Sequence, residues 1–310
     1  MFYRWPLFLL CAVALAGPVA ADPSFKPYEL ECLGNQTQQP WSVAYAEDGT
    51  FYVADMRGSA VEHFDACGQL LARWGTAGTG ESQLLWPTGI ALDRDTVYVT
   101  DIGTRRVRKF LTDGTFLAAF GGYASLDVPY GVAIDRCGNV CVADLGRQSI
   151  VVFDRAGRVV RDFRTKAGID LAIDRNGDIY VAGFSGWLQK FSADGTLLAK
   201  ALVPDPAIVT QFRAVALDRQ GRVHYVHTAG RRILVFDTRL RLLGQWQLPP
   251  ELGPRPFLFD LAFDDRGRAV MTNEFEPKIT VYRARPSPWR DDLTEVRTTT
   301  WGRVKAAYRK

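Results

Sequence analysis

The sequence is poor in the residues and motifs that mark common catalytic centres. It has three histidines and five cysteines in 310 residues, and the absence of a Cys-x-x-Cys pair gives no support to a thioredoxin-like redox role. It contains no Gly-rich phosphate loop and no Gly-x-Ser-x-Gly elbow. Its one long apolar run is shorter than the roughly 20 residues that span a bilayer. Nothing in the sequence therefore demands an enzyme.

The first 21 residues have the layout of a secretory signal peptide. Arg4 precedes an apolar run over residues 7–16, a Gly17-Pro18 break follows, and small residues end the segment at Ala21. Cleavage after Ala21 predicts an exported chain, secreted or periplasmic, with no transmembrane anchor in its mature form. A retained anchor is the alternative interpretation of the same run. The leader and the near absence of glycosylation sequons favour a bacterial source.

Four cysteines remain after removal of the leader, namely Cys32, Cys67, Cys137 and Cys141. An even number in an exported protein permits two disulfides with three possible connectivities. Cys137 and Cys141 flank one tight turn and could pair, or they could serve as small buried hydrophobic residues. The spacing does not decide between these alternatives.

The formal net charge of +4 is concentrated at the C-terminus. Residues 283–310 hold eight Arg or Lys residues against three acids, so the rest of the mature chain is slightly acidic. An exported, slightly acidic body is not expected to bind nucleic acid. We expect residues 285–310 to form a basic tail beyond the last repeat. This tail could dock on an anionic surface, stay mobile, or pack Trp301 against the body.

One pattern returns six times between residues 40 and 282. Each unit has a short apolar strand, a turn, and an apolar-aromatic strand that ends in a polar residue, with period-two alternation and no helical stretch. The second strand ends 39 to 46 residues apart, at Asp55, Asp101, Asp144, Gly183, His227 and Asn273. An aromatic residue of the third strand keeps the same spacing, at Phe64, Phe110, Phe153, Phe191, Phe236 and Tyr282. The repeat predicts an all-β fold, a six-bladed β-propeller with four-stranded antiparallel blades.

A ring of blades must also close. The sequence after Tyr282 runs into a Pro-rich segment and offers no outer strand, whereas residues 28–34 resemble the outer strands of the first two blades. We therefore expect residues 28–33 to complete blade six, so that the two ends of the chain pair and no edge is left open. This places the propeller domain at residues 22–284.

The units resemble NHL repeats, whose pattern is Pro-x-Gly-hydrophobic-Ala, then Tyr-Val-Ala-Asp, then Arg-Val-x-x-Phe. The third unit carries it in residues 129–133, 142–144 and 149–153. The resemblance covers residues 40–282 and is looser in blades four to six, where Gly168, Phe212 and Leu258 replace the leading Pro. It implies that the loop before the first strand and the loop after the second open at the same mouth of the channel.

Residues at these two positions are the candidates for a binding surface. The first-strand loops supply Trp41, Tyr130, Arg213 and Phe259, and the second-strand ends supply Asp55, His227 and Asn273. A recurrent Asp in this place also has a structural explanation, because its carboxylate can accept backbone N–H groups of the following turn. His227 and Asn273 break that pattern, which makes them the more informative candidates.

Two further acids interrupt the pattern. Asp170 and Asp260 stand where blades two and three have Gly89 and Gly131, at the start of innermost strands. Their oxygens could bind Ca²⁺, or each could cap a neighbouring loop. The gluconolactonase and paraoxonase group, also six-bladed, binds Ca²⁺ at its channel mouth through Glu, Asn and Asp. Asn273, Asp170 and Asp260 could correspond to these Ca²⁺ ligands. The start of blade one, however, has no acid, whereas that group typically has a Glu there.

A zinc site is not expected. In the related peptidyl-hydroxyglycine amidating lyase, histidines after the leading Pro hold the metal, and none of His63, His224 and His227 stands there. The resemblance and the candidate residues together predict a binding module for a peptide, a saccharide or a partner protein. The alternative is a Ca²⁺-dependent hydrolase of the lactonase or esterase type. The sequence does not predict the oligomeric state.

Overall fold

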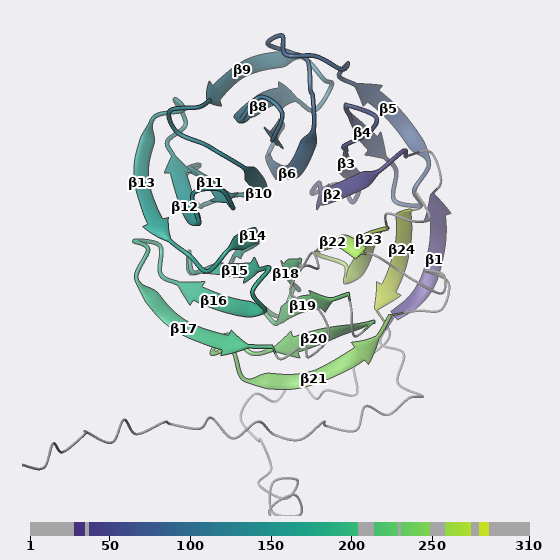
Figure 1. The fold of residues 1–310 in the computed structure, drawn as a ribbon. Helices are drawn as coiled ribbons and strands as arrows, with labels where there is room; N and C mark the ends of the chain where they lie inside the picture. Colours follow the sequence, from purple (N-terminus) through teal and green to yellow (C-terminus); the bar gives the residue numbers. More distant parts are fainter. Residues whose placement is uncertain are drawn as a thin grey trace, which may run out of the picture.

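The computed structural model describes residues 28–34, 37–203, 214–228, 231–248, 258–273 and 279–284. Within these residues the chain forms six four-stranded antiparallel sheets and no helix. Figure 1 shows the sheets arranged as blades around a central axis. The predicted six-bladed all-β propeller is confirmed. The leader at residues 1–21 and the tail at residues 285–310 lie outside the described residues, and the described part holds no helix that could span a membrane.

The first two strands of each blade lie nearest the axis (Figure 1). The innermost strands are β2 (Pro40–Tyr45), β6 (Pro87–Asp93), β10 (Pro129–Ile134), β14 (Gly168–Ile173), β18 (Val215–Leu217) and β22 (Leu258–Phe263). The second strands are β3 (Phe51–Asp55), β7 (Thr96–Asp101), β11 (Val140–Asp144), β15 (Ile179–Gly183), β19 (Val223–His227) and β23 (Arg268–Asn273).

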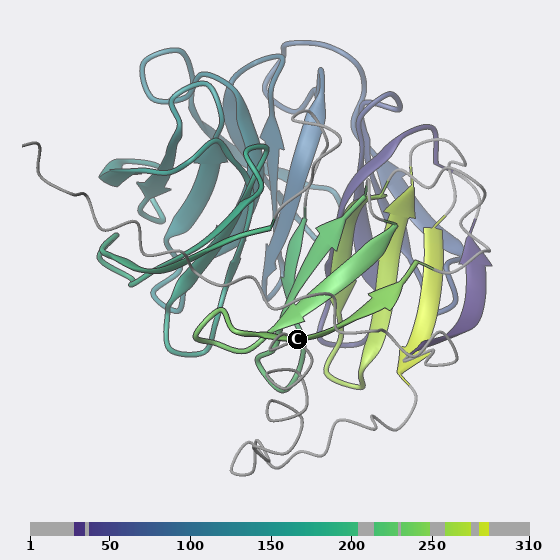
Figure 2. The same ribbon diagram turned by 60° about the horizontal axis from the view of Figure 1, so that its bottom comes forward.

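The outer half of each blade completes the sheet, and Figure 2 shows its strands crossing the thickness of the ring. The third strands are β4 (Ala60–Phe64), β8 (Arg106–Leu111), β12 (Ser149–Phe153), β16 (Trp187–Phe191), β20 (Arg232–Phe236) and β24 (Ile279–Ala284). The outermost strands are β5 (Leu70–Trp74), β9 (Phe116–Gly121), β13 (Val159–Arg164), β17 (Leu197–Leu202), β21 (Leu242–Gln247) and β1 (Tyr28–Gly34).

The ring closes as the sequence predicts. Strand β1 pairs antiparallel with β24, from Tyr28 opposite Ala284 to Gly34 opposite Ile279. Residues from the start of the propeller thus supply the outer strand of blade six. This pairing covers the edge of β24, which would otherwise present unpaired backbone groups.

The hydrophobic core consists of six clusters, each between two neighbouring blades. Successive side chains of a strand point to opposite faces, so one strand serves two clusters. In β3, Phe51 and Val53 pack against blade six, whereas Tyr52 and Ala54 pack against blade two. This explains why every residue of β3 is buried. The recurrent third-strand aromatics, from Phe64 to Tyr282, are buried in the same way.

Three cysteines have described side chains, and all are free thiols. Cys137 lies exposed in a turn, whereas Cys141 lies on β11 and packs into the cluster between blades three and four. The suggested Cys137–Cys141 pair is therefore absent. Burial raises the pKa of the Cys141 thiol to about 12, which makes it inert. Cys67 is exposed, and the side chain of Cys32 lies outside the described part.

A buried arginine links blade six to blade one at the face away from the ends of the second strands. The Arg268 guanidinium donates to the Asp264 carboxylate at 2.6 Å and to the carbonyl oxygens of Gly49 at 3.0 Å and Ala66 at 3.3 Å. Arg158 of blade three makes the same i,i+4 pair with Asp154 at 2.7 Å, but its side chain is 81% exposed. Of these two arginines, Arg268 alone joins two blades through a buried ion pair.

Replacing Arg268 with Met should destabilise the propeller much more than replacing Arg158 with Met. The first change leaves Asp264 buried without its partner, which costs about 3 kcal/mol. The second removes an exposed pair that solvent screens, which contributes little to stability. Urea denaturation of both variants measures the difference. Equal losses of unfolding free energy would contradict the role given to Arg268.

Blade one carries a carboxyl group where blade two carries a guanidinium. Arg108 is fully buried and donates to Asp101 at 2.8 Å. Glu62 occupies the same register position in β4 and lies beside Asp55, with Arg73 on one oxygen at 3.3 Å. Burial and then the charge of Asp55 raise the pKa of Glu62 to about 8. Glu62 therefore holds a proton at neutral pH.

This raised pKa predicts a pH dependence of stability. The folded-state pKa lies above the ordinary value of 4.5, so protonated Glu62 favours the native state. That contribution is complete below about pH 4.5 and is lost as the pH rises through about 8. Glu62→Gln should therefore unfold with a free energy that depends less on pH than the wild type between about pH 5 and pH 9. Denaturant titrations at both pH values test this, and an unchanged pH dependence in the variant would contradict it.

Candidate functional site

The residue that begins a first strand pairs with the residue that ends the second strand. Pro40 pairs with Asp55, Pro129 with Asp144, and Leu258 with Asn273. The loops before the first strands and after the second strands therefore open on one face, as expected. We call this face the mouth.

The recurrent aspartates connect these two loops. The fully buried Asp55 carboxylate accepts N–H groups of Gln38 and Gln39 at 2.8 Å and of Gly58 at 2.9 Å. The Asp144 carboxylate does the same for Asp127, Val128 and Arg147. The structural explanation thus accounts for this Asp, and Asp55 acts on the mouth by fixing its loop.

The other second-strand candidates are also buried. His227 and Asn273 end β19 and β23 with 2% and 1% of their surface exposed. Arg213 lies outside the described residues, as do residues 204–212 and 249–257, which precede the first strands of these two blades. The described part of the mouth is therefore built mainly from blades one, two, three, four and six.

Three aromatic residues from separate blades come together at the mouth. Trp41 follows the first residue of β2, Tyr130 that of β10 and Phe259 that of β22. The ring centroids of Trp41 and Phe259 lie 4.1 Å apart with the planes at 19°, and those of Trp41 and Tyr130 lie 6.0 Å apart at 27°. Phe259 is buried, whereas Trp41 and Tyr130 keep part of their surface exposed. We call these three residues the aromatic stack.

Threonines of the neighbouring blades hold the aromatic stack by its backbone. The Thr100 hydroxyl donates to the carbonyl oxygen of Tyr130, and the Thr272 hydroxyl donates to that of Trp41 at 3.4 Å. Gly89 lies against the Tyr130 carbonyl so closely that a Cβ atom there would meet the oxygen at 2.3 Å. Sequence reasoning missed these threonines, although their matching place before the last residue of β7 and β23 was a usable signal.

Two acids in matching register positions connect one blade to the next: Asp260, which follows Phe259, and Asp170 in blade four. The Asp260 carboxylate accepts the Ser42 hydroxyl at 2.7 Å and the Val43 N–H at 2.9 Å. The Asp170 carboxylate accepts the Val215 N–H at 2.8 Å. Both acids thus bond to the innermost strand of the following blade, whereas the capping role considered for them was on a neighbouring loop.

The two carboxyl groups also affect each other across the channel. Burial raises the pKa of Asp260 to about 6. Burial and then the charge of Asp260 raise the pKa of Asp170 well above its ordinary value, as expected for two acids that repel each other. Asp170 Oδ1 lies 2.7 Å from where a Cβ atom of Gly131 would be, and Gly131 follows Tyr130. The carboxyl pair, Asp170 and Asp260, therefore lies directly beside the aromatic stack.

The carboxyl pair does not by itself make a calcium site. Ca²⁺ takes six to eight oxygen ligands, and among the described residues no group of three or more His, Cys, Asp or Glu residues comes together. The two oxygens of Asp260 already accept three hydrogen bonds, from Ser42, Val43 and Leu261. Among the described residues, both carboxyl groups are engaged in hydrogen bonds to the chain.

Removing the Asp260 charge should lower the pKa of Asp170. In Asp260→Asn the repulsion disappears, while burial still keeps the Asp170 pKa above its ordinary value. Carboxyl ¹³C NMR titration of wild type and variant measures the shift, with the exposed Asp113 carboxyl as an internal reference. An unchanged Asp170 titration would show that the two groups do not interact.

Comparisons with known proteins agree with this architecture. Residues 43–169 match the family described as the SMP-30/gluconolactonase/LRE-like region. A segment of 138 residues is 28% identical to Protein brain tumor of Drosophila melanogaster, and it covers 44% of this chain but 13% of that protein. Together with the six repeats, these matches support an NHL-like propeller. The chain is an NHL-like six-bladed propeller.

Solved structures share the fold of this NHL-like propeller at 12% sequence identity. A streptogramin B lyase structure aligns with a TM-score of 0.62 over 83% of this chain and 98% of that chain. Virginiamycin B lyase from Staphylococcus aureus aligns at 0.59 over 84% and 89%. The WD40 β-propeller domain of Doa1 aligns at 0.60 over 86% and 100%. At this identity the likeness shows the fold alone.

Proposed function

We propose that this NHL-like propeller is a ligand-binding module whose site is formed by the aromatic stack and the carboxyl pair. The observation that carries the proposal is the convergence of Trp41, Tyr130 and Phe259 from three blades beside Asp170 and Asp260. Aromatic rings that converge with a few polar groups at a concave site are typical of ligand recognition. The hydrogen bonds of Asp170 and Asp260 to the following blades also make the site rigid in the absence of a ligand.

The chemistry of the site favours a ligand with an apolar face and hydrogen-bonding groups. Aromatic rings offer contact area with little conformational freedom to lose. Burial raises the pKa values of both acids, and their carboxyl groups place polar atoms beside the aromatic rings. A saccharide and a peptide segment both combine an apolar surface with hydroxyl or N–H groups. A segment of a partner protein would offer the same chemistry.

The proposal includes an extracytoplasmic setting. The signal-peptide pattern of residues 1–21 supports export, after which the propeller would meet its ligand in a periplasm or outside the cell. Secretion of the full-length chain, with an N-terminus beginning at Asp22, is the result that this part of the proposal expects.

Truncating the aromatic stack should abolish most of the binding. We expect Trp41→Ala to weaken a saccharide or peptide ligand at least tenfold, since a buried aromatic anchor contributes about 2 kcal/mol or more. Leu242→Ala, on the exposed outer strand of blade five, is the matched control and should bind as wild type. Thermal-shift screening finds the ligand and calorimetry measures the affinities. Equal affinities of wild type and Trp41→Ala would contradict the proposed site.

The second candidate is a Ca²⁺-dependent lactonase or esterase-like hydrolase. It is favoured by the match of residues 43–169 to the SMP-30/gluconolactonase/LRE-like region. Lactone hydrolysis that requires Ca²⁺, stops with a chelator and is lost in Asp170→Asn would establish this function instead. Unchanged melting temperatures with Ca²⁺ and with chelator, and no lactone turnover, would favour the binding module.

A further inference from the structure

A polar pocket, which we call the rim pocket, lies at the outer strands of blade three, on the same face as the mouth. It encloses about 530 Å³ and is lined by Gly146, Arg147, Ser149, Asp162, Phe163 and Arg164. Ser149 begins β12 and pairs with Arg164 at the end of β13, which places the pocket between the two outer strands. It is separate from the aromatic stack, which lies on the innermost strands.

The pocket exists because the connection after β13 is short. In blades one and two, the loops after the outer strands carry the fully buried Leu84 and Leu126. These leucines pack so closely that a Cβ atom at Gly75 or Gly121 would lie 3.0 or 2.8 Å from them. In blade three, residues 165–167 alone join β13 to β14, and Arg164 stands in the register position of Gly121. No leucine therefore covers the start of β12.

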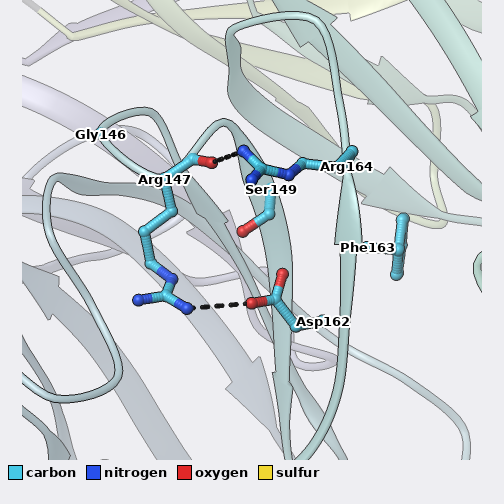
Figure 3. A pocket seen from close by; sticks show the side chains of 6 residues that line it. All are labelled: Gly146, Arg147, Ser149, Asp162, Phe163 and Arg164. Atoms are coloured by element: carbon cyan, nitrogen blue, oxygen red, sulfur yellow. Dashed lines mark hydrogen bonds and ion pairs between the residues drawn. The ribbon is translucent and has the colours of Figure 1, made fainter.

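A buried hydroxyl group in this pocket has no partner within the described chain. Ser149 is 2% exposed, and its Oγ atom makes no hydrogen bond. Figure 3 shows the Ser149 side chain between the side chains of Arg147 and Arg164, with Asp162 facing it. Buried polar groups in folded proteins are nearly always hydrogen-bonded. The unsatisfied donor therefore points to a group beyond the described part of the chain.

The charges around Ser149 indicate the sign of that group. Arg147 donates to Asp162 at 3.1 Å, and Arg164 donates to the carbonyl oxygen of Arg147 at 3.0 Å. Arg164 makes no ion pair in the described part of the chain, so two guanidinium groups face one carboxylate. The nearby Asp127, which lies against Gly146, is itself paired with Arg105 at 2.5 Å. One positive charge in the pocket is left uncompensated.

We propose that this pocket binds an anionic oxygen-bearing group, a carboxylate or a sulfate or phosphate ester. Ser149 would donate its hydroxyl hydrogen to one oxygen, and the free N–H groups of Arg164 and Arg147 would donate to the others. Guanidinium groups hold such groups through paired, charge-assisted hydrogen bonds. The site is independent of the proposed binding function at the aromatic stack.

Titration of the mature protein with sodium sulfate, sodium phosphate and sodium acetate at constant ionic strength tests this site. We expect saturable NMR shifts at the Ser149 amide and the Arg164 side-chain N–H for at least one anion, and the anion that saturates identifies the ester or carboxylate chemistry. Arg164→Gln and Ser149→Ala should each weaken that anion tenfold or more. Arg158→Gln removes the same charge from an exposed turn of the same blade and should have no effect.

Two results would overturn the proposal. One is the absence of saturable shifts with all three anions in the folded wild type. The other is the same affinity in wild type, Ser149→Ala and Arg164→Gln, with melting curves showing that both variants are folded. Trp41→Ala should bind the anion as tightly as wild type does, so that failure at one site is distinguishable from failure at the other.

Discussion

The whole molecule depends on the contacts between neighbouring blades. A four-stranded blade with apolar residues on both faces cannot bury both alone, so each of the six core clusters needs two blades. The ring is therefore closed only when the contacts between blades six and one have formed. Three sets of contacts close the ring. Strand β1 pairs with β24, Arg268 bonds to Gly49 and Ala66, and Asp260 bonds to Ser42 and Val43.

The same contacts position the candidate site. Thr272 of blade six donates to the carbonyl oxygen of Trp41, and Asp260 accepts the hydroxyl of Ser42, the next residue. Thr100 of blade two donates to the carbonyl oxygen of Tyr130. The aromatic stack is thus held by its backbone as well as by its rings. A ligand that binds there gains affinity because little remains to be ordered. The contacts of the innermost strands therefore both close the ring and position the candidate site.

The fold could be predicted from the sequence, because repeat units with the same pattern adopt the same arrangement of strands. The spacing of the third-strand aromatics gave the six blades, the missing outer strand after Tyr282 gave the closure by residues 28–33, and the recurrent Asp had a clear turn-forming explanation. The candidates Trp41, Tyr130 and Phe259 came from one register position, and that position faces one mouth. The local pattern was therefore sufficient for the fold and for the common position of these three aromatic residues.

The other features depend on contacts between residues of different blades, which the pattern of a single repeat does not reveal. Asp170 and Asp260 lie in blades four and six, and only the closed ring shows that one raises the pKa of the other. The rim pocket depends on a leucine that blade three lacks and blades one and two have. Cys137 and Cys141 are close in sequence, yet one lies in a turn and the other in the core. Arg213 lies outside the described residues, so its role stays a prediction.

Native-state hydrogen exchange of the Val43 amide tests most directly whether the blade junction and the mouth form one unit. This N–H donates to Asp260 across the junction, next to Ser42 and Trp41. If the junction holds the site, its exchange requires global unfolding, and its opening free energy equals that of the whole protein. An opening free energy several kcal/mol below the global value would show that the mouth opens locally, and would contradict the account.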